Sequence, residues 1–193
     1  MICRLALLFS LVSITACAGP TGRAKYETPN YKAVASDGAF EIRDYPSMVL
    51  ATTPMAATKR SGQNSAFMNL FRYISGKNAN SQKIEMTTPV FSTMKEQDNA
   101  MSFVVPAEVV AGGVPQANNP EVVINKRAAG RYAAYQYSGR WSQAREREAR
   151  EKLASWVQKR GLKLIGEYEK ASYDPPFTPP SKRRNEVLIR ITK

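Results

Sequence analysis

Apolar and polar side chains alternate along several short stretches of the chain, a spacing typical of half-buried β-strands. One such stretch is Lys83–Met94 (KIEMTTPVFSTM), in which Ile84, Met86 and Val90 share a side. Because Pro89 has no backbone N–H to donate, we expect this strand to lie at an edge or to carry a bulge. The same pattern predicts further strands at Phe40–Arg43, Met48–Met55, Met101–Val105, Val122–Ile124, Tyr132–Tyr137, Leu164–Tyr173 and Glu186–Ile191.

A first helix is predicted from Asn64 or Ser65 to a stop at Gly76. Asparagine and serine are favoured caps, and glycine commonly ends a helix. The apolar residues between them recur at i, i+3, i+4 and i+7, which is the spacing of one helical face. We expect this face to pack on the sheet through Phe67, Leu70, Phe71 and Ile74.

A second, longer helix is predicted from a Ser142 cap to Arg160, just before Gly161. Its apolar face consists of Ala149, Leu153, Trp156 and Val157. The opposite face mixes acidic and basic residues at spacings that allow i,i+4 pairs. A nucleic-acid interface would need a stripe of one sign, so we interpret this face as a solvated surface.

The order broken strand, helix, strand, strand occurs twice, at about 38–106 and about 121–192, around a predicted loop at Ala107–Pro120. Residue identity between the two halves is weak, so the repeat is one of pattern. Two β-α-β-β units can join their edges into one curved, mainly antiparallel sheet or a distorted β-barrel with two flanking helices. We therefore predict an α+β fold with a concave surface, where small ligands commonly bind.

The N-terminus has the layout of an export signal. Arg4 precedes the apolar run Leu5–Ile14, which is too short to span a bilayer, and small residues lead to Cys17. This resembles a bacterial lipoprotein signal, which implies a signal peptide at 1–16, a lipid on Cys17 and a tether at 17–30 before a domain at 31–193. An ordinary signal peptide and a chance apolar start are the alternatives. By resemblance to the sorting rules of enterobacterial lipoproteins, Ala18 after the cysteine implies the outer membrane, facing the periplasm.

The positions of the two cysteines and the absence of histidine exclude several kinds of functional site. The two cysteines are Cys3, inside the predicted signal, and Cys17, and the chain contains no histidine. The predicted domain therefore cannot form a disulfide, a zinc–thiolate site or a cysteine nucleophile. It also lacks the commonest general base, metal ligand and haem ligand.

The chain carries 28 basic and 16 acidic residues, a formal net charge of +12. Such an excess suits nucleic acid, an anionic membrane surface or an anionic ligand. An exported, lipid-anchored protein rarely meets nucleic acid. We therefore expect an anionic ligand or lipid and no nucleic-acid partner. We also expect the protein to be a monomer.

Four blocks resemble the SOUL haem-binding protein family, in the family's order and spacing: Phe67–Gly76 (FMNLFRYISG), Lys83–Val90 (KIEMTTPV), Tyr173–Pro176 (YDPP) and Arg183–Ile189 (RRNEVLI). The similarity extends from about Tyr31 to Ile191. It implies a distorted antiparallel barrel of two β-α-β-β units. It also implies non-covalent binding of haem or a related tetrapyrrole in a hydrophobic cleft beside the first helix, with basic side chains towards the propionates. Members with a coordinating histidine are no template for this chain.

The resemblance and the residue chemistry together give six candidate ligand-binding residues: Phe67, Met68, Phe71, Arg72, Lys83 and Met86. The flexible thioether of Met68 suits a large flat ligand, although a methionine at such a position more often fills a gap in the core. Arg72 matches a basic position that the family places near the propionates, where a guanidinium binds a carboxylate bidentately. Lys83 could instead be a charged guard of a strand edge. Met86 or the Tyr73 phenolate could ligate iron, with core positions as the alternative.

Two other classes of function stay open beside haem binding. The duplicated arrangement resembles effector-binding barrels that accept varied amphipathic compounds. An enzyme is the third class, but no carboxylate pair is evident, and Glu85 and Asp174 are the only suggestively placed acids. The hydroxyls of Thr87 and Thr88 are expected to bond neighbouring backbone near Pro89, so we predict no catalytic and no metal site.

Overall fold

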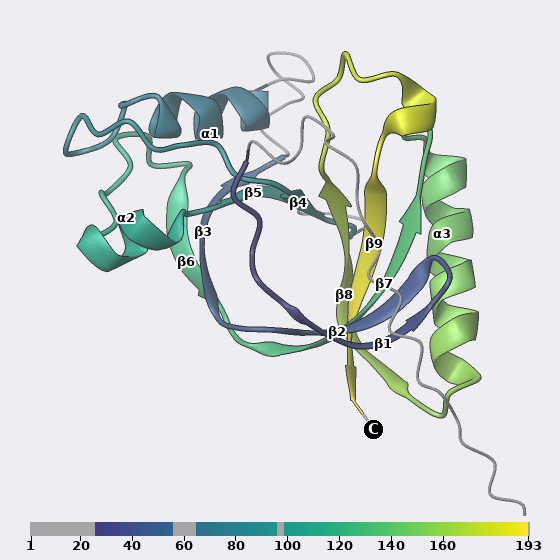
Figure 1. Cartoon of the computed structure of the whole chain (residues 1–193). Helices are drawn as coiled ribbons and strands as arrows, with labels where there is room; N and C mark the ends of the chain where they lie inside the picture. Colours follow the sequence, from purple (N-terminus) through teal and green to yellow (C-terminus); the bar gives the residue numbers. More distant parts are fainter. Residues whose placement is uncertain (1–25, 56–64, 96–98, 193) are drawn as a thin grey trace, which may run out of the picture.

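The structure is a computed structural model that describes residues 26–55, 65–95 and 99–192 (Figure 1). The predicted signal peptide at 1–16, Cys17 and most of the predicted tether lie outside the described residues. Along the chain the elements are β1 (Lys32–Asp37), β2 (Phe40–Tyr45), β3 (Met48–Pro54), α1 (Ser65–Ile74), β4 (Val90–Thr93), β5 (Ala100–Val104), α2 (Ala107–Gly112), β6 (Val123–Arg127), β7 (Gly130–Tyr137), α3 (Gln143–Gln158), β8 (Lys163–Ser172), the 3₁₀ turn η3 (Pro180–Lys182) and β9 (Asn185–Thr192).

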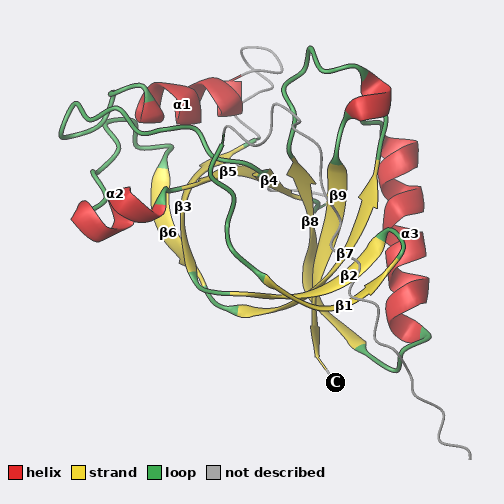
Figure 2. Ribbon diagram, in the orientation of Figure 1, coloured by secondary structure: helices red, strands yellow, loops and turns green. Residues whose placement is uncertain are grey.

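The nine strands of the described residues form one strongly curved antiparallel sheet in the order β1-β2-β7-β9-β8-β4-β5-β3-β6 (Figure 2). The predicted α+β curved sheet is confirmed. The sheet does not close into the distorted barrel that was the other predicted form, because β1 and β6 are the two ends of the strand order and do not pair with each other within the described residues.

The two predicted helices are present and pack on different halves of the sheet. The shorter helix α1 contacts β3 and β5, whereas α3 contacts β7, β8 and β9. Ser142 caps α3, since its hydroxyl accepts the backbone N–H of Arg145 at 3.3 Å. No helix in the described part of the chain is long and apolar enough to cross a bilayer.

A third helix, α2, occupies part of the segment predicted as a loop, so that prediction is wrong for Ala107–Gly112. Glycine and proline residues further along the segment indicate a loop, and its first six residues are too few to show a helical pattern. Val109 explains why the helix forms. Its side chain is buried in the core beneath α1, and tertiary packing stabilises a helix too short to form alone.

The stretch Lys83–Met94 is a strand only over Val90–Thr93, which is shorter than predicted. Before β4, Lys83 and Thr87 form isolated bridges with Ser75 and Glu27. Thr87, Thr88 and Pro89 are buried one after another, which breaks the alternation of a half-buried strand. The predicted edge position is also wrong, because β4 pairs with β5 on one side and β8 on the other. Pro89 lies just before the ladder and removes no hydrogen bond from it.

The buried face of α1 also differs from the prediction. Ala66, Leu70, Tyr73 and Ile74 are buried against the sheet, whereas Phe67 and Phe71 are 36% and 43% exposed. Successive residues rotate by about 100° around a helix, so Phe67 and Phe71 share one flank of the apolar stripe. The sheet covers that flank only in part, with Phe67 against Phe103 of β5 (Ala100–Val104), so the flank is available to line a cavity.

A buried ion pair lies within the apolar interior of the sheet. Arg43 on β2 donates from Nη1 and Nη2 to the Glu186 carboxylate on β9 at 2.6 and 2.9 Å. Tyr173 and Arg184 also donate to this carboxylate, which is fully buried. Burial opposes both charges, but the mutual hydrogen bonds and attraction outweigh it. They raise the pKa of Arg43 and lower the pKa of Glu186.

We expect Glu186→Gln to lower the free energy of unfolding by about 3–5 kcal/mol, because Arg43 and Arg184 both lose this buried carboxylate and Arg43 keeps only the partly exposed Glu41 as an ion-pair partner. The folded-state pKa of Glu186 lies below its ordinary value of 4.5. The stabilisation is therefore complete above about that pH and is lost as the pH falls through the lower, folded-state value. Urea unfolding measured between pH 3 and pH 7 tests both points.

A matched control is Asp44→Asn, which removes the exposed pair between Asp44 and Arg131. Exposed ion pairs are screened by water, so this variant should unfold almost as the parent does. Equal stability of the Glu186→Gln protein and the parent at pH 7 would contradict the role assigned to the pair.

Candidate functional site

One cavity in the described part of the chain has a volume of about 1060 Å³, just above the usual size range of small-molecule sites. It lies between α1, the segments 86–95 and 99–101, the start of α3 and the connection from β8 to β9. Figure 1 shows α1 and the β8–β9 connection at the same end of the sheet. We call it the apolar cavity.

One wall of the apolar cavity is aromatic and comes from the exposed flank of α1. The rings of Phe67 and Phe71 stack with centroids 6.0 Å apart and an interplanar angle of 13°. Phe67 also packs edge-on against Phe103 of β5 at 5.4 Å, which holds its ring in place. The remaining apolar lining includes the flexible side chains of Met55, Met86, Met94 and Met101. Such a wall suits a large flat ligand.

The opposite side of the apolar cavity is rich in cations. Five basic side chains line it, against the two carboxylates Glu146 and Asp174: Lys95, Arg147, Arg150, Lys170 and Arg183. Glu146 accepts hydrogen bonds from the Trp141 indole at 2.7 Å and from Arg150 at 2.6 Å. This carboxylate therefore orients two other lining side chains, and the excess of positive charge favours an anionic group on the ligand.

Lys170 brings a half-buried ammonium group to the apolar cavity. Its Nζ atom lies 4.9 Å from the centroid of the Trp141 ring, within cation–π distance. Burial lowers the pKa of Lys170, and the nearby Glu146 carboxylate partly offsets that effect. A ligand carboxylate at this position would replace lost solvation and favour the charged amine.

Residues of the YDPP and RRNE blocks form hydrogen bonds that hold one edge of the apolar cavity in place. The Tyr173 hydroxyl donates to Glu186 at 3.0 Å, and the Arg184 backbone N–H donates to Asp174 at 2.6 Å. The Asn185 amide donates to the Gly139 carbonyl at 3.1 Å. These bonds hold the β8–β9 connection beside the start of α3, so the blocks position the site through packing and hydrogen bonding.

The hydroxyl groups near Pro89 are already engaged in the structure. Thr87 donates to the backbone carbonyl of Val104 at 2.7 Å, as predicted, whereas the Thr88 hydroxyl pairs with the Thr28 hydroxyl at 3.2 Å. Glu85 is exposed and does not line the cavity. No group of three or more acidic, cysteine or histidine residues in the described ranges could hold a metal ion.

Three of the six predicted ligand-binding residues meet in the apolar cavity: Phe67, Phe71 and Met86. The other three, Met68, Arg72 and Lys83, are exposed and are not among its lining residues. Their contact with a ligand stays a prediction. Tyr73 takes the core position, because its ring is buried and its hydroxyl donates to the Pro115 carbonyl at 2.9 Å.

Sequence reasoning did not select Trp141, Arg147 or Lys170 as site residues, although all three line the cavity. A tryptophan directly before the Ser142 cap was the one available signal for Trp141. Lys170 lies within a predicted strand, where a single lysine is commonly a surface residue. Only the pairing of β8 with β4 brings it opposite α1.

A family model described as SOUL heme-binding protein matches residues 26–190. Heme-binding protein 2 of Homo sapiens is 30% identical over 178 residues, covering 84% of this chain and 85% of the human protein. Among solved structures, the C-terminal domain of EcmrR is similar with a TM-score of 0.57 and 13% identity, covering 84% of this chain and 98% of that domain. A protein described as a hydrolase from Listeria innocua has a TM-score of 0.55 and 10% identity, with coverage of 82% and 94%. These two structures are similar in fold.

Proposed function

The chain belongs to the SOUL heme-binding protein family, and from that premise we propose that it binds haem or a related tetrapyrrole, non-covalently, in the apolar cavity. The observation that carries the proposal is the pairing of a stacked Phe67–Phe71 wall with a cationic opposite side. Haem has the same division, since its macrocycle is apolar and its two propionates are anionic. We propose a binding role without catalysis.

The residues that line the cavity fit the two parts of this ligand. The phenylalanine rings and the methionines would contact the macrocycle, which buries apolar surface on both partners. Arg147, Lys170 and Arg183 supply donors for the propionates, and a guanidinium can bind a carboxylate bidentately.

Haem iron would be held here without a histidine, because the chain contains none. Thioether sulfur and tyrosine are known alternatives as axial ligands. The Tyr173 hydroxyl donates to Glu186, and burial holds its pKa well above the ordinary value, so Tyr173 is unsuited to act as a phenolate. The methionine sulfurs, with Met86 as the predicted residue, are the better candidates for contact with iron.

We also propose that the protein is a monomeric lipoprotein of the bacterial cell envelope, anchored at the outer membrane and facing the periplasm. The support is the sequence layout: a short apolar run, small residues and Cys17, followed by a Gly/Pro-rich segment. Residues 26–28 already contact the domain, since the Glu27 carbonyl accepts the Thr88 N–H at 2.9 Å. The proposed tether would thus end close to the apolar cavity, which Tyr26 helps to line.

A second candidate function is promiscuous binding of flat hydrophobic molecules. The four methionines favour it, because unbranched thioether side chains adapt to ligands of different shape. The two functions differ in how much the basic side chains of the cavity contribute to affinity. That contribution is large only for a ligand that carries carboxylates.

Hemin titration of a chain that starts at Ala24 tests the proposed site. We expect a saturable Soret shift with quenching of Trp141, and Phe67→Ser and Phe71→Ser should each weaken binding about 10- to 100-fold by removing an aromatic contact. Met86→Ala should weaken binding less. The control is Val123→Ser, which changes an exposed apolar residue of β6 outside the cavity.

The same titration with Met68→Ala and Arg72→Ala decides whether the ligand extends beyond the cavity lining. Unchanged affinity in both variants would confine the ligand to the lining residues. If the parent protein gave no saturable Soret shift, the proposed function would fail.

Comparison of hemin with protoporphyrin IX dimethyl ester separates the two candidate functions. For a site that recognises propionates, Lys170→Met and Arg147→Met should weaken hemin binding about 10-fold each, because a charge-assisted hydrogen bond is lost. Binding of the ester, measured by the same fluorescence quenching, should not change. Equal affinity of the parent protein for both compounds would favour the promiscuous module.

Metabolic labelling with radioactive palmitate in a Gram-negative host tests the proposed anchor. We expect label in the parent protein and none in Cys17→Ser. Cys3→Ser is the matched control and should keep the label, because Cys3 lies inside the proposed signal peptide. Label that persists in Cys17→Ser would rule out lipidation at this position.

A further inference from the structure

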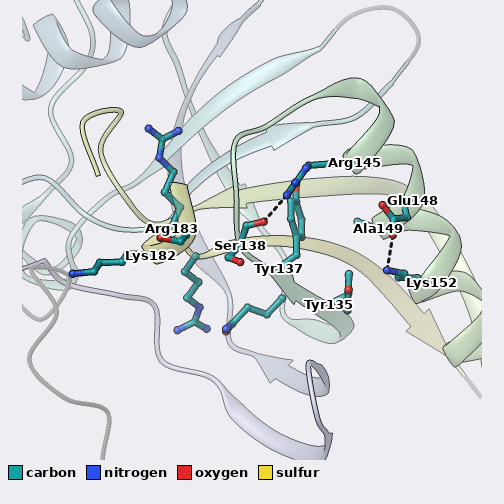
Figure 3. A pocket seen from close by; sticks show the side chains of 12 residues that line it. Tyr135, Tyr137, Ser138, Arg145, Glu148, Ala149, Lys152, Lys182 and Arg183 are labelled. Atoms are coloured by element: carbon teal, nitrogen blue, oxygen red, sulfur yellow. Dashed lines mark hydrogen bonds and ion pairs between the residues drawn. The ribbon is translucent and has the colours of Figure 1, made fainter. Parts of the chain in front are cut away.

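A second cavity, of about 690 Å³, lies between β7, α3 and the η3 turn (Figure 3). Its lining is mainly polar and contains one carboxylate, Glu148, against five basic side chains: Arg145, Lys152, Lys182, Arg183 and Arg184. We call it the basic cavity. Arg183 lines both cavities, but the other lining residues are not shared.

Two of the five basic side chains in the basic cavity pair with carboxylates, whereas two others bond to backbone carbonyl groups. Lys152 pairs with Glu148 at 2.6 Å, and Arg184 pairs with Glu186 at 2.6 Å. Arg145 and Arg183, in contrast, donate to backbone carbonyl oxygens, those of Ser138 and of Thr178 and Pro176. A carbonyl group has no net charge, so these bonds orient the two guanidinium groups without neutralising them.

Gly139 lies in the turn between β7 and α3, against the guanidinium group of Arg145. Its N–H donates to the Pro180 carbonyl at 2.9 Å, and its carbonyl accepts from the Asn185 amide at 3.1 Å. The φ angle of +111° favours glycine, and a Cβ atom would lie 2.1 Å from Arg145 Nη1. The turn after β7 is therefore tied to the β8–β9 connection and leaves room for one guanidinium.

The Tyr137 hydroxyl is a buried polar atom with no hydrogen-bond partner in the described part of the chain. Tyr137 lines the basic cavity, where its ring stacks on Tyr135 at 6.2 Å. Figure 3 shows the Tyr137 ring beside the Arg145 side chain. Burial raises the pKa of Tyr137 to about 12, so at neutral pH the hydroxyl keeps its proton and can donate it. A buried donor without an acceptor is costly, and a ligand oxygen would remove that cost.

We propose that the basic cavity binds the phosphate group of a soluble organic phosphate, with Arg145 and Tyr137 as donors to it. A phosphate offers several strong acceptor oxygens, which suits donors that converge from β7, α3 and η3. The cavity is larger than one phosphate group, so the organic part also fits, and the polar lining requires that part to be polar. This site is separate from the proposed tetrapyrrole site and does not depend on it.

Isothermal titration with inorganic pyrophosphate, using the full-length chain in non-ionic detergent, tests the proposal. We expect saturable binding that weakens about 10- to 100-fold in Arg145→Gln, because one charge-assisted donor is lost. Arg140→Gln is the matched control. It removes the same charge from an exposed position nearby that does not line the cavity, and should change the affinity less than about twofold by screening.

Tyr137→Phe gives a second, independent readout. Without pyrophosphate its melting temperature should equal or exceed that of the parent, because the lost hydroxyl has no partner in the described structure. With pyrophosphate, the affinity should fall about 10-fold. A structural role alone would instead lower the melting temperature and leave the affinity unchanged.

Three results would overturn the proposal. The first is no saturable heat with pyrophosphate, and the second is equal weakening in Arg140→Gln and Arg145→Gln, which would indicate unspecific surface attraction. The third comes from a parallel titration with detergent micelles that contain phosphatidic acid. Binding to these micelles without binding to pyrophosphate would assign the cavity to a lipid headgroup instead of a soluble ligand.

Discussion

The ion pair between Arg43 and Glu186 is the interaction on which the rest of the site depends. A buried charge is tolerated only when it is paired and hydrogen-bonded, so β2 and β9 must keep their places on either side of β7. Glu186 also accepts hydrogen bonds from Tyr173 and Arg184, which begin and end the β8–β9 connection. One buried carboxylate thereby fixes both the interior of the sheet and the loop that borders the apolar cavity.

The β8–β9 connection then separates two cavities of different chemistry. On the apolar cavity it presents Pro175 and Pro176 opposite the phenylalanine flank of α1, whereas its η3 turn helps to form the basic cavity. Gly139 joins this connection to the start of α3 through its N–H and its carbonyl. These bonds hold the β8–β9 connection, whose Arg183 lines both cavities, beside the start of α3.

The sequence pattern predicted the order of most elements, but it missed strand β1 (Lys32–Asp37) and misjudged three other local features. The short helix α2 escaped notice, because its six residues form only through the burial of Val109. The stretch Lys83–Met94 alternates like one strand, yet Thr87 to Pro89 are all buried by contacts with segments near Glu27 and Val104. The apolar stripe of α1 is wider than the surface that the sheet offers, so Phe67 and Phe71 could not be assigned to core or cavity from periodicity alone.

The sequence by itself determined the chemistry that the domain can use and the family to which it belongs. It contains no histidine, its two cysteines precede the described residues, and its conspicuous blocks match the family along the chain. Only the tertiary structure decided that the sheet stays open, which cations reach the apolar cavity, and that Arg43 and Glu186, 143 residues apart, form a pair. The physical reason is that a sequence pattern reports on neighbouring residues, whereas these features depend on residues far apart in the chain. Periodicity reports which face of an element is apolar, whereas the convergence of Phe67, Trp141 and Lys170 depends on strand register and on long-range packing.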